Sequence, residues 1–384
     1  MIAFIQGCSL YALDQGGSTR IFRSLLDTDH PPVLSVSTSF STKSAPAASN
    51  EVRVPTRPYF GRLDRTRLHP GLGVFDGLFR MRFEARLLHL LIEHHVKLIH
   101  LLVADYSVVS VRTVASQLRI PYFITIHDYL EYVSRGHPFL KQMVASVAEA
   151  WRGAREVFVI SEELGQDYSQ RFGAREYRII TDGLKSVAEA PIRRPPKSLR
   201  IYFMGLFHLA YGPNLRALLD ALKIVRSKRP DWDISITCRC GAISVPIQED
   251  DVHANILPFA SQREVEKDML SADLLYQPLP FQEYALPMCK FSMSTKMVTY
   301  IGSGLPILYH GPNNAAACRL LVRHKAAVVC TTLDPVAIAK QLLDTGQRRE
   351  SIAGNALALA RSQFMLNEQQ GRFWPPIIKA LQQE

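Results

Sequence analysis

The rest of the chain is organised around FSMSTKMVTYIGSGLPIL, residues 291–308. Ser294 and Thr295 are candidates for a helix N-cap, because a side-chain oxygen there can accept a hydrogen bond from a free amide of the first turn. Apolar residues then recur at helical spacing, and two glycines supply a C-terminal stop. The apolar run that follows the glycines is typical of a buried parallel strand.

Lys296 lies in the first turn of this predicted helix. Free amides at a helix start and a positive charge together favour an anion, so the pattern indicates a phosphate site. An ordinary strand–helix unit with a surface lysine is the alternative, and from the helix alone it is the better account.

Composition narrows the class of protein. The chain has 384 residues, 47% hydrophobic and 21% charged, which is typical of a soluble globular protein long enough for two cores. Its formal charge of +10 favours an anionic partner. We expect no nucleic-acid partner, because no RNP-type motif, zinc finger or recognition-helix pattern is visible.

Cysteine spacing argues against a zinc site, and hydropathy argues against a membrane-spanning segment. The six cysteines lack the paired spacing of a zinc site and are expected to be reduced core thiols. The N-terminus has no basic region and is expected to be a first strand. The most apolar run, residues 96–111, is broken by Lys97, His100 and Asp105, so no membrane-spanning segment is expected.

Strands and helices alternate twice along the chain. Strands are predicted in the first half at residues 2–5, 33–36, 99–103, 122–126, 157–160 and 177–180, and in the second half at residues 199–204, 234–238, 256–257 and 274–276. This alternation predicts an α/β fold of two Rossmann-like doubly wound domains that face each other across a cleft. In such sheets the ligand lies at the carboxyl ends of the strands.

Domain boundaries follow from composition. The expected N-terminal acceptor-side domain covers residues 1–184, and a Pro/Arg-rich linker covers residues 185–198. The expected donor domain covers residues 199–365. Residues 366–384 are expected to form a C-terminal helix that packs back on the N-terminal domain.

Several blocks resemble those of a known family. Residues 201–205 with 211–214, residues 272–278 and residues 296–306 are similar, in this order, to the donor-domain blocks of GT-B glycosyltransferases of family 4 and its relatives. Residues 16–17, 125–128, 160–162 and 182–183 also fit, so the resemblance covers nearly the whole chain.

The resemblance implies a glycosyltransferase. A nucleotide-sugar donor, which is a co-substrate, would bind the C-terminal half, and a glycan or lipid-linked acceptor would bind the N-terminal half. Transfer would retain the anomeric configuration, without a metal or another cofactor, and the donor diphosphate would help to deprotonate the acceptor. The expected donor-binding residues are Gly16, Gly17, Gly205, Phe259, Glu283, Ser294, Thr295, Lys296 and Thr299.

The chain also departs from the family. The family usually has two glutamates eight positions apart, and here Phe291 and Thr299 occupy those positions. The second glutamate normally holds the nucleotide ribose, so Thr299 offers either a weaker hydroxyl contact or none. The usual Arg and Lys pair early in the donor domain is missing, and only His208 and Arg216 lie nearby. These departures leave both the donor nucleotide and the retention of activity open.

His127 and Asp128 are the candidate catalytic residues. His127 follows a predicted buried strand at its carboxyl end, where an imidazole can contact the sugar. Asp128 is the alternative acid or base, and its structural role would be to cap the next helix. The Asp-x-Asp at residues 231–233 precedes a strand at its amino end, far from the expected cleft, so we predict no metal.

The glycines and Glu283 have structural alternatives. Gly16 and Gly17 permit close approach of the backbone to a donor, but turn glycines after a first strand are common for structural reasons. Glu283 either holds sugar hydroxyls or is a solvated loop carboxylate.

Three other functions compete. A non-hydrolysing UDP-sugar 2-epimerase shares the architecture but needs clustered carboxylates and histidines. A non-catalytic binding protein with the same fold is favoured by Phe291 and Thr299. An NAD(P) oxidoreductase would need Gly-x-Gly-x-x-Gly after the first strand, which residues 15–20 do not provide.

A basic segment in the first half points to a membrane. Residues 53–86 hold eight arginines and three carboxylates, a net charge of +5 that is half of the chain's formal charge, interleaved with Phe, Leu and Met. For the helix near its end, a core face with solvated arginines is the better account. For the preceding loop we expect an acceptor or anionic membrane surface, formed by Arg57, Arg62, Arg65 and Arg67. The expected protein is a cytoplasmic enzyme peripheral to the inner face of the membrane.

Overall fold

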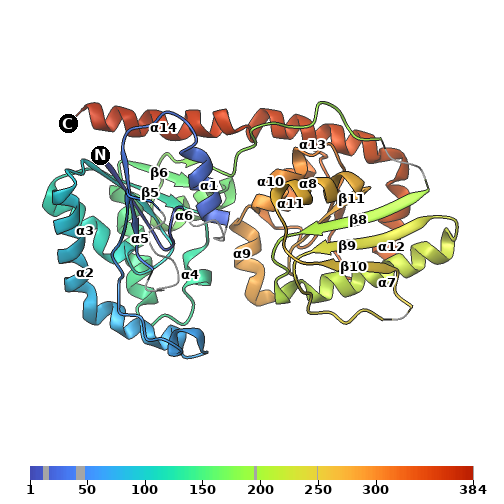
Figure 1. Ribbon diagram of the computed structural model, residues 1–384, viewed down its shortest axis with the longest axis horizontal. Helices are drawn as coiled ribbons and strands as arrows, with labels where there is room; N and C mark the ends of the chain where they lie inside the picture. The colour runs from blue at the N-terminus through green and yellow to red at the C-terminus, as the bar shows by residue number, and fades with distance from the viewer. Residues whose placement is uncertain (12–16, 40–47, 194–196, 249, 384) are drawn as a thin grey trace. The chain divides into compact units, whose positions relative to one another are not determined.

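The computed structural model describes residues 1–11, 17–39, 48–193, 197–248 and 250–383. The chain divides into two compact units, each with its own sheet (Figure 1). Unit 1 consists of Met1–Gly183 and Leu366–Glu384, and unit 2 consists of Leu184–Met365.

The described residues of unit 1 form a seven-stranded sheet in which all neighbouring strands are parallel. Its order is β3-β2-β1-β4-β5-β6-β7. The strands are β1 (Ile2–Gln6), β2 (Val33–Ser37), β3 (Glu51–Arg53), β4 (Leu98–Leu102), β5 (Tyr122–Ile126), β6 (Glu156–Val159) and β7 (Arg178–Ile179).

Helices cover both faces of this sheet. Figure 1 shows α2, α3 and α5 on one side and α1 and α14 on the other. The helices are α1 (Gly17–Leu25), α2 (Val74–Glu93), α3 (Val108–Leu118), α4 (Leu130–Val133), α5 (Leu140–Gly153), α6 (Glu162–Phe172) and α14 (Leu366–Gln382). Trp374 of α14 donates its indole N–H to the Leu25 carbonyl at 2.8 Å, which joins the last helix to the first.

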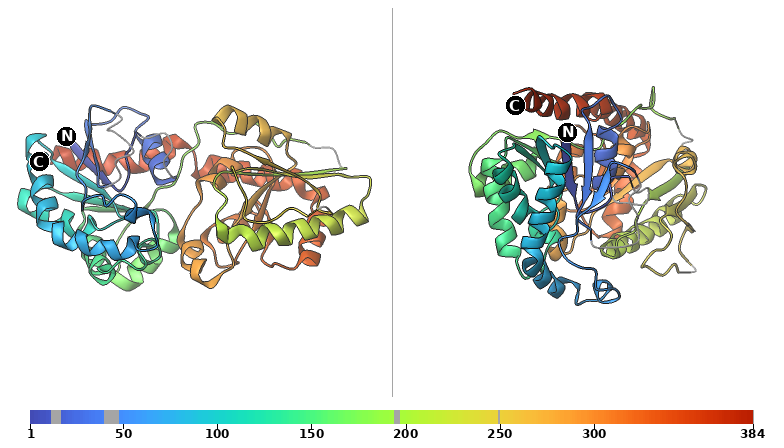
Figure 2. Two further views of the ribbon diagram at one scale, coloured as in Figure 1. Left: turned by 60° about the horizontal axis from the view of Figure 1, so that its bottom comes forward. Right: turned by 60° about the vertical axis from the view of Figure 1, so that its left-hand side comes forward.

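Unit 2 repeats this plan with a six-stranded parallel sheet of order β10-β9-β8-β11-β12-β13 in its described residues. The strands are β8 (Ser198–Met204), β9 (Asp233–Arg239), β10 (His253–Leu257), β11 (Leu274–Pro278), β12 (Ile307–His310) and β13 (Val328–Cys330). Figure 2 shows α7 along one face of this sheet.

The helices of unit 2 form two layers. Helix α7 (Gly212–Lys228) packs with α12 (Pro335–Asp344) on one face. The other helices are α8 (Gln262–Ser271), α9 (Leu286–Phe291), α10 (Thr295–Ile301), α11 (Ala316–Arg323) and α13 (Arg349–Gln363), and they pack mainly around a second apolar cluster. The prediction of two Rossmann-like doubly wound domains is therefore confirmed.

The central strands are buried on both faces, which explains their nearly continuous apolar sequences. Strand β4 carries one polar side chain, His100, stacked between Phe4 at 4.8 Å and Phe158 at 5.7 Å. Its Nε2 lies 2.7 Å from the Thr125 hydroxyl. Burial lowers the pKa of His100 to about 3, so this imidazole is neutral in the core.

The described part of the expected linker, residues 185–193 and 197–198, belongs to unit 2 and does not form a separate segment. The amides of Ala188 and Ile192 donate to the carbonyls of Gly302 and Gly304, at 2.9 and 2.8 Å. Gly304 has φ +77°, and a Cβ there would lie 2.9 Å from the Ala190 carbonyl oxygen, so this contact requires glycine. The described part of the Pro/Arg-rich segment therefore packs on the helix–strand turn after α10.

Two further expectations need correction. Ser294 is the N-cap residue of α10, but its side chain makes no capping hydrogen bond. Cys8 is exposed, whereas the other five cysteines are buried thiols as expected. In the described part of the chain, no helix has both the length and the apolar character to cross a membrane.

Candidate functional site

Each sheet reverses its strand order at one point, and in such sheets ligands bind beside that point at the carboxyl ends of the strands. The reversal lies between β1 and β4 in unit 1 and between β8 and β11 in unit 2. This order depends on which strands pair, so the sequence alone did not locate the two points.

In unit 2, Gly205 follows β8 at the reversal point. It has φ +87°, and its amide donates to the Arg239 carbonyl at 3.0 Å. A Cβ on Gly205 would lie 3.3 Å from Cδ of Lys296. The glycine therefore lets the lysine side chain pass close to the end of β8, which brings together two of the predicted donor-binding residues.

The ammonium of Lys296 lies on apolar and aromatic groups. Its Nζ is 4.5 Å from the Phe203 ring centroid and 5.4 Å from that of Tyr211, and it donates to the Leu206 carbonyl at 3.4 Å. No carboxylate in the described part of the chain forms an ion pair with it. Desolvation lowers the pKa of Lys296 to about 8. The site therefore holds a partly desolvated cation that a bound anion would stabilise.

The two positions that depart from the family pattern differ in their surroundings. Phe291 is buried at the end of α9, with Nζ of Lys290 4.7 Å from its ring centroid. Thr299 is half-buried, and its hydroxyl donates to the Thr295 carbonyl at 3.3 Å. Position 291 therefore belongs to the core, whereas the Thr299 hydroxyl is bonded to the backbone within α10.

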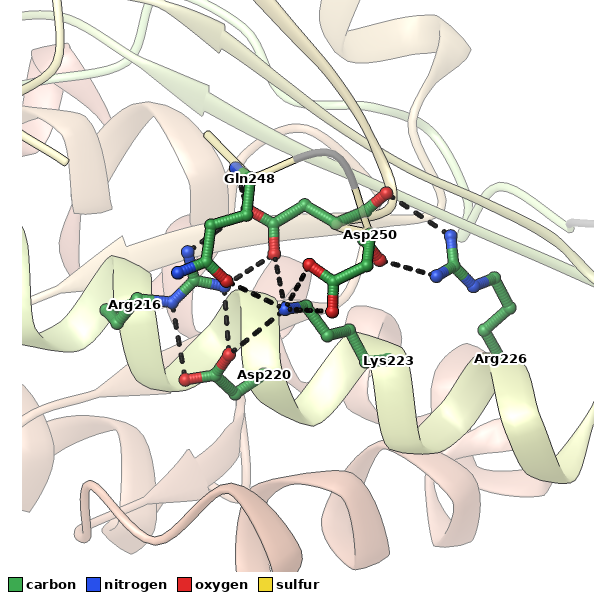
Figure 3. Close-up of polar contacts among 7 residues, drawn as sticks. Arg216, Asp220, Lys223, Arg226, Gln248 and Asp250 are labelled. Carbon is green, nitrogen blue, oxygen red and sulfur yellow. Dashed lines mark hydrogen bonds and ion pairs between the residues drawn. The ribbon is translucent and has the colours of Figure 1, made fainter. Parts of the chain in front are cut away.

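Arg216 is engaged in an ion-pair network and cannot replace the missing basic pair (Figure 3). It donates to Asp220 at 2.9 Å and to Asp251 at 2.5 Å, and the Asp251 side chain is fully buried. Burial alone would raise the pKa of Asp251, but hydrogen bonds from Arg216 hold it far below its usual value. Lys223 joins the network through Asp250 at 2.9 Å. The network fastens the loop after β9 to α7.

The remaining predicted donor residues of unit 2 are accessible or half-buried. Phe259 is 62% exposed, and its ring lies 3.2 Å from the position of a Cβ on Gly241, in the loop after β9. Ser294 and Thr295 are half-buried at the start of α10, and Glu283 is exposed. No contact of a described residue links Glu283 to Lys296. His208 is exposed, and its ring accepts a hydrogen bond from the Ala210 amide.

In unit 1, His127 directly follows β5. It is 5% exposed and stacks on Phe22 of α1 at 5.5 Å. Neither ring nitrogen has a hydrogen-bond partner among the described residues. Burial lowers the pKa of His127 to about 3, so the ring is neutral. Gly17 is the first residue of α1, and Gly16 lies outside the described residues.

Asp128 is half-buried beside His127. The N-cap residue of the following helix α4 is Tyr129, so the capping role suggested for Asp128 is wrong. At the amino end of β9, Asp231 pairs with Lys197 at 2.8 Å. No group of three or more potential metal ligands occurs in the described ranges.

A residue that the sequence did not single out, Asp105, lies at the reversal point of unit 1. Its Oδ2 is 3.4 Å from the position of a Cβ on Gly7, and it accepts hydrogen bonds from the Thr38 hydroxyl and, at 2.9 Å, from the Ser107 amide. The buried Gln6 Nε2 and Ser107 Oγ beside it have no partner among the described residues. In the sequence, Asp105 appeared only as a break in an apolar run.

The prediction that Arg57 contributes to an acceptor or membrane surface is wrong. Arg57 is 2% exposed, and it pairs with Asp64 at 2.5 Å and with Asp76 at 3.7 Å. It therefore holds the loop together and cannot contact a membrane or an acceptor. Arg62 and Arg67 are exposed, and the side chain of Arg65 lies outside the described atoms.

Comparisons with known proteins agree with this architecture. Residues 19–183 match the model of the Glycosyl transferase 4-like domain. No curated protein matches the chain. Among solved structures, HepE of Anabaena in complex with UDP is 15% identical, with 100% of each chain covered and a TM-score of 0.67.

Two further structures are similar. HepE of Anabaena in complex with UDP-glucose is 14% identical, over 100% of this chain and 99% of that one, with a TM-score of 0.63. The α,α-trehalose 6-phosphate synthase of Burkholderia multivorans is 14% identical, over 99% and 96%, with a TM-score of 0.61. The resemblance of this chain to GT-B glycosyltransferases of family 4 and its relatives is therefore confirmed, by the domain match in the first half and by the fold throughout.

Proposed function

We propose that this protein is a glycosyltransferase that moves a hexosyl group from a nucleoside diphosphate sugar to a glycan or lipid-linked acceptor, in polysaccharide or glycolipid assembly. The observation that carries the proposal is Lys296, a partly desolvated cation beside the end of β8, at the point where the strand order reverses. The similar HepE binds UDP and UDP-glucose, which supports a uridine nucleotide as the first donor to test.

Each end of the donor has a residue suited to it. Lys296 would pair with the diphosphate and stabilise the charge that develops when the sugar leaves, so the step is proposed to need no metal. The exposed ring of Phe259 offers an apolar surface for the base, and Thr299 offers one hydroxyl oxygen to the ribose. The neutral His127 would contact the sugar.

The proposed transfer retains the anomeric configuration. The bond between the anomeric carbon and the diphosphate oxygen breaks, and its electron pair leaves with the diphosphate. The acceptor oxygen forms the new bond on the same face, and its proton passes to the departing diphosphate. Asp105 and Asp128 are proposed to position the acceptor hydroxyl, because both lie at carboxyl ends of strands in unit 1.

A thermal-shift panel of UDP, GDP, ADP and their sugars tests the proposal. A ligand that binds only the folded protein raises its midpoint by mass action, so one nucleotide and its sugars should raise it. Slow release of that nucleotide from its sugar without an acceptor would support a transferase, whereas interconversion of two sugars would identify a 2-epimerase. No shift with any nucleotide would contradict the proposal.

The second candidate is a nucleotide-sugar-binding protein without turnover. The buried Phe291 favours it, because position 291 offers the ligand no polar group, and Thr299 brings no charge. This candidate predicts the same thermal shift but an intact donor after long incubation.

A further inference from the structure

Helix α2 of unit 1 has two apolar faces. The inner face packs in the core through Phe83, Leu87 and Leu91, which are at most 2% exposed. The outer face carries Leu78, 71% exposed, and Met81, 82% exposed. A helix on the surface of a monomer ordinarily presents polar residues to water, so this second face needs an explanation.

The exposed apolar residues form one stripe. Val74, Leu78, Met81 and Ile92 follow one another at intervals of four, three and eleven residues, which return to the same side of a helix. Val74 and Ile92 are 43% and 56% exposed. The stripe extends over about 27 Å, at 1.5 Å per residue.

Most of the charges beside the stripe are positive. Arg82 and Arg86 are exposed on the same helix. Of the nearby carboxylates, Asp64 and Asp76 are buried against Arg57, and Glu84 pairs with Arg80 at 2.7 Å. Glu93, the last residue of α2, is exposed, and its carboxylate lies 3.7 Å from Nδ1 of His89. We call the stripe with its two arginines the α2 face: Val74, Leu78, Met81, Arg82, Arg86 and Ile92.

The segment before α2 is held by buried polar contacts. Asp76 accepts hydrogen bonds from Thr56 at 2.6 Å and from His137 at 3.2 Å. A Cβ on Gly73 would lie 2.5 Å from Nε2 of His137, so the helix start packs closely on that ring. In the same segment, Leu63 is 47% exposed and Leu68 is 65% exposed. They are next to the exposed Arg62 and Arg67 in the sequence. The apolar and basic side chains are therefore presented from a fixed backbone.

We propose that the α2 face binds the surface of an anionic phospholipid membrane. The apolar stripe would enter the boundary between headgroups and acyl chains, and Arg82 and Arg86 would contact lipid phosphates. A second copy of the chain fits less well, because a two-fold interface through this face would bring like charges of both copies together. The proposal rests on the proposed function only in that a lipid-linked acceptor would be met there.

Vesicle co-sedimentation without a sugar donor tests the proposal. The full chain should sediment with vesicles of phosphatidylglycerol and phosphatidylcholine, and remain in the supernatant with phosphatidylcholine alone. Binding should weaken as salt shortens the Debye length. Wild-type protein that stays in the supernatant with anionic vesicles at low salt would overturn the proposal.

Two double variants separate the apolar and the basic contributions. Leu78→Ser with Met81→Ser should weaken binding about tenfold or more, because less apolar surface enters the membrane. Arg82→Ser with Arg86→Ser should weaken it about 25-fold at low salt and remove most of its salt dependence. Arg57 is left intact, because its burial makes it part of the folded loop.

The matched control is Val322→Ser with Arg323→Ser, an exposed apolar and basic pair on α11 of unit 2. It should bind vesicles like the wild type. If the Leu78 and Met81 variant also binds like the wild type, the proposal is wrong. A dimer that this variant abolishes, together with no vesicle binding, would assign the face to a second copy instead. The nucleotide-induced thermal shift should be unchanged in every variant, which separates this result from the proposed function.

Discussion

The ammonium of Lys296 lies 4.5 Å from the centroid of the Phe203 ring, with no carboxylate partner in the described part of the chain. A cation on an aromatic ring gains some stabilisation, but the lowered pKa of this lysine indicates that the gain does not replace its lost hydration. A bound anion such as a diphosphate would stabilise the charged form of this lysine.

Replacing Lys296 by alanine should weaken UDP binding. A hydrogen bond to a charged group is typically worth about 1.5–3 kcal/mol, so affinity measured by titration calorimetry should fall about 10- to 150-fold. Lys340→Ala, at an exposed lysine on α12, is the control and should leave UDP affinity unchanged. Unchanged affinity in a folded Lys296→Ala protein would remove this lysine from the site.

UDP affinity should depend on pH through the same residue. Because the pKa of Lys296 is about 8, the free protein loses this charge as pH rises above 8, and affinity should fall by up to about tenfold per pH unit. Lys296→Arg keeps its charge and should bind equally across this range. A wild-type affinity that is constant between pH 7 and 9.5 would argue against a direct contact.

Stability should follow the opposite trend at high pH. The pKa of Lys296 lies below its usual value of 10.5, so the unfolded chain binds more protons between about pH 8 and 10.5. The contribution of Lys296 to the free energy of unfolding should therefore rise over this range. In denaturant titrations, the free energies of unfolding of wild type and Lys296→Met should differ less at pH 10.5 than at pH 8.

His127→Ala should reduce turnover more than donor affinity, because the ring is assigned to the sugar. We expect turnover to fall about 10- to 100-fold. The pKa of about 3 keeps the imidazole neutral, so the wild-type pH–rate profile should show no limb from His127 between pH 5 and 8. Wild-type turnover in His127→Ala would return this residue to a purely structural role.

Much of the fold could be predicted from the sequence, because alternating apolar segments and turn residues have a local origin. The strand at Tyr122–Ile126 was predicted with the residues that the structure shows. Strand order is a long-range property, so the reversal points and Asp105 were missed. Likewise, the net charge of the segment drew attention to Arg57 but could not show that it is buried and paired with Asp64 and Asp76.

The location of the proposed membrane-binding face could not be predicted from the sequence either. The sequence favoured the loop arginines and assigned α2 to the core with a solvated basic face. The inner face of α2 is core, but Leu78 and Met81 on its other side are exposed. Only the packing of α2 shows which of its two apolar faces is exposed.

Asp105→Asn should raise the KM for the acceptor and leave UDP affinity unchanged, because Asp105 is assigned to the acceptor hydroxyl and Lys296 to the diphosphate. An amide keeps one acceptor oxygen for the Thr38 or Ser107 contact but removes the charge. Steady-state kinetics with acceptor varied at saturating donor measures the effect. An unchanged acceptor KM would leave Asp105 as a residue that only stabilises the start of α3.

Gly183→Ala should destabilise the protein by about 1–3 kcal/mol, because a new Cβ would lie 2.8 Å from the Cα of Leu366. Gly371→Ala is the control. It lies exposed in α14 with no atom within 4 Å of its Cβ position, and should stabilise the helix by about 0.5–1 kcal/mol. Equal unfolding midpoints for the two variants would contradict this packing.

Glycosyl transfer by this protein can be tested by following the fate of the donor. Purified protein is incubated with each UDP-, GDP- and ADP-sugar, with and without anionic vesicles carrying extracted lipid-linked glycans, and free nucleoside diphosphate is measured over time. We predict that one nucleotide sugar is cleaved, faster with acceptor, and that Lys296→Ala abolishes most of the cleavage. A wild-type protein that binds a nucleotide sugar but leaves it intact under every condition would contradict the account and identify a binding protein.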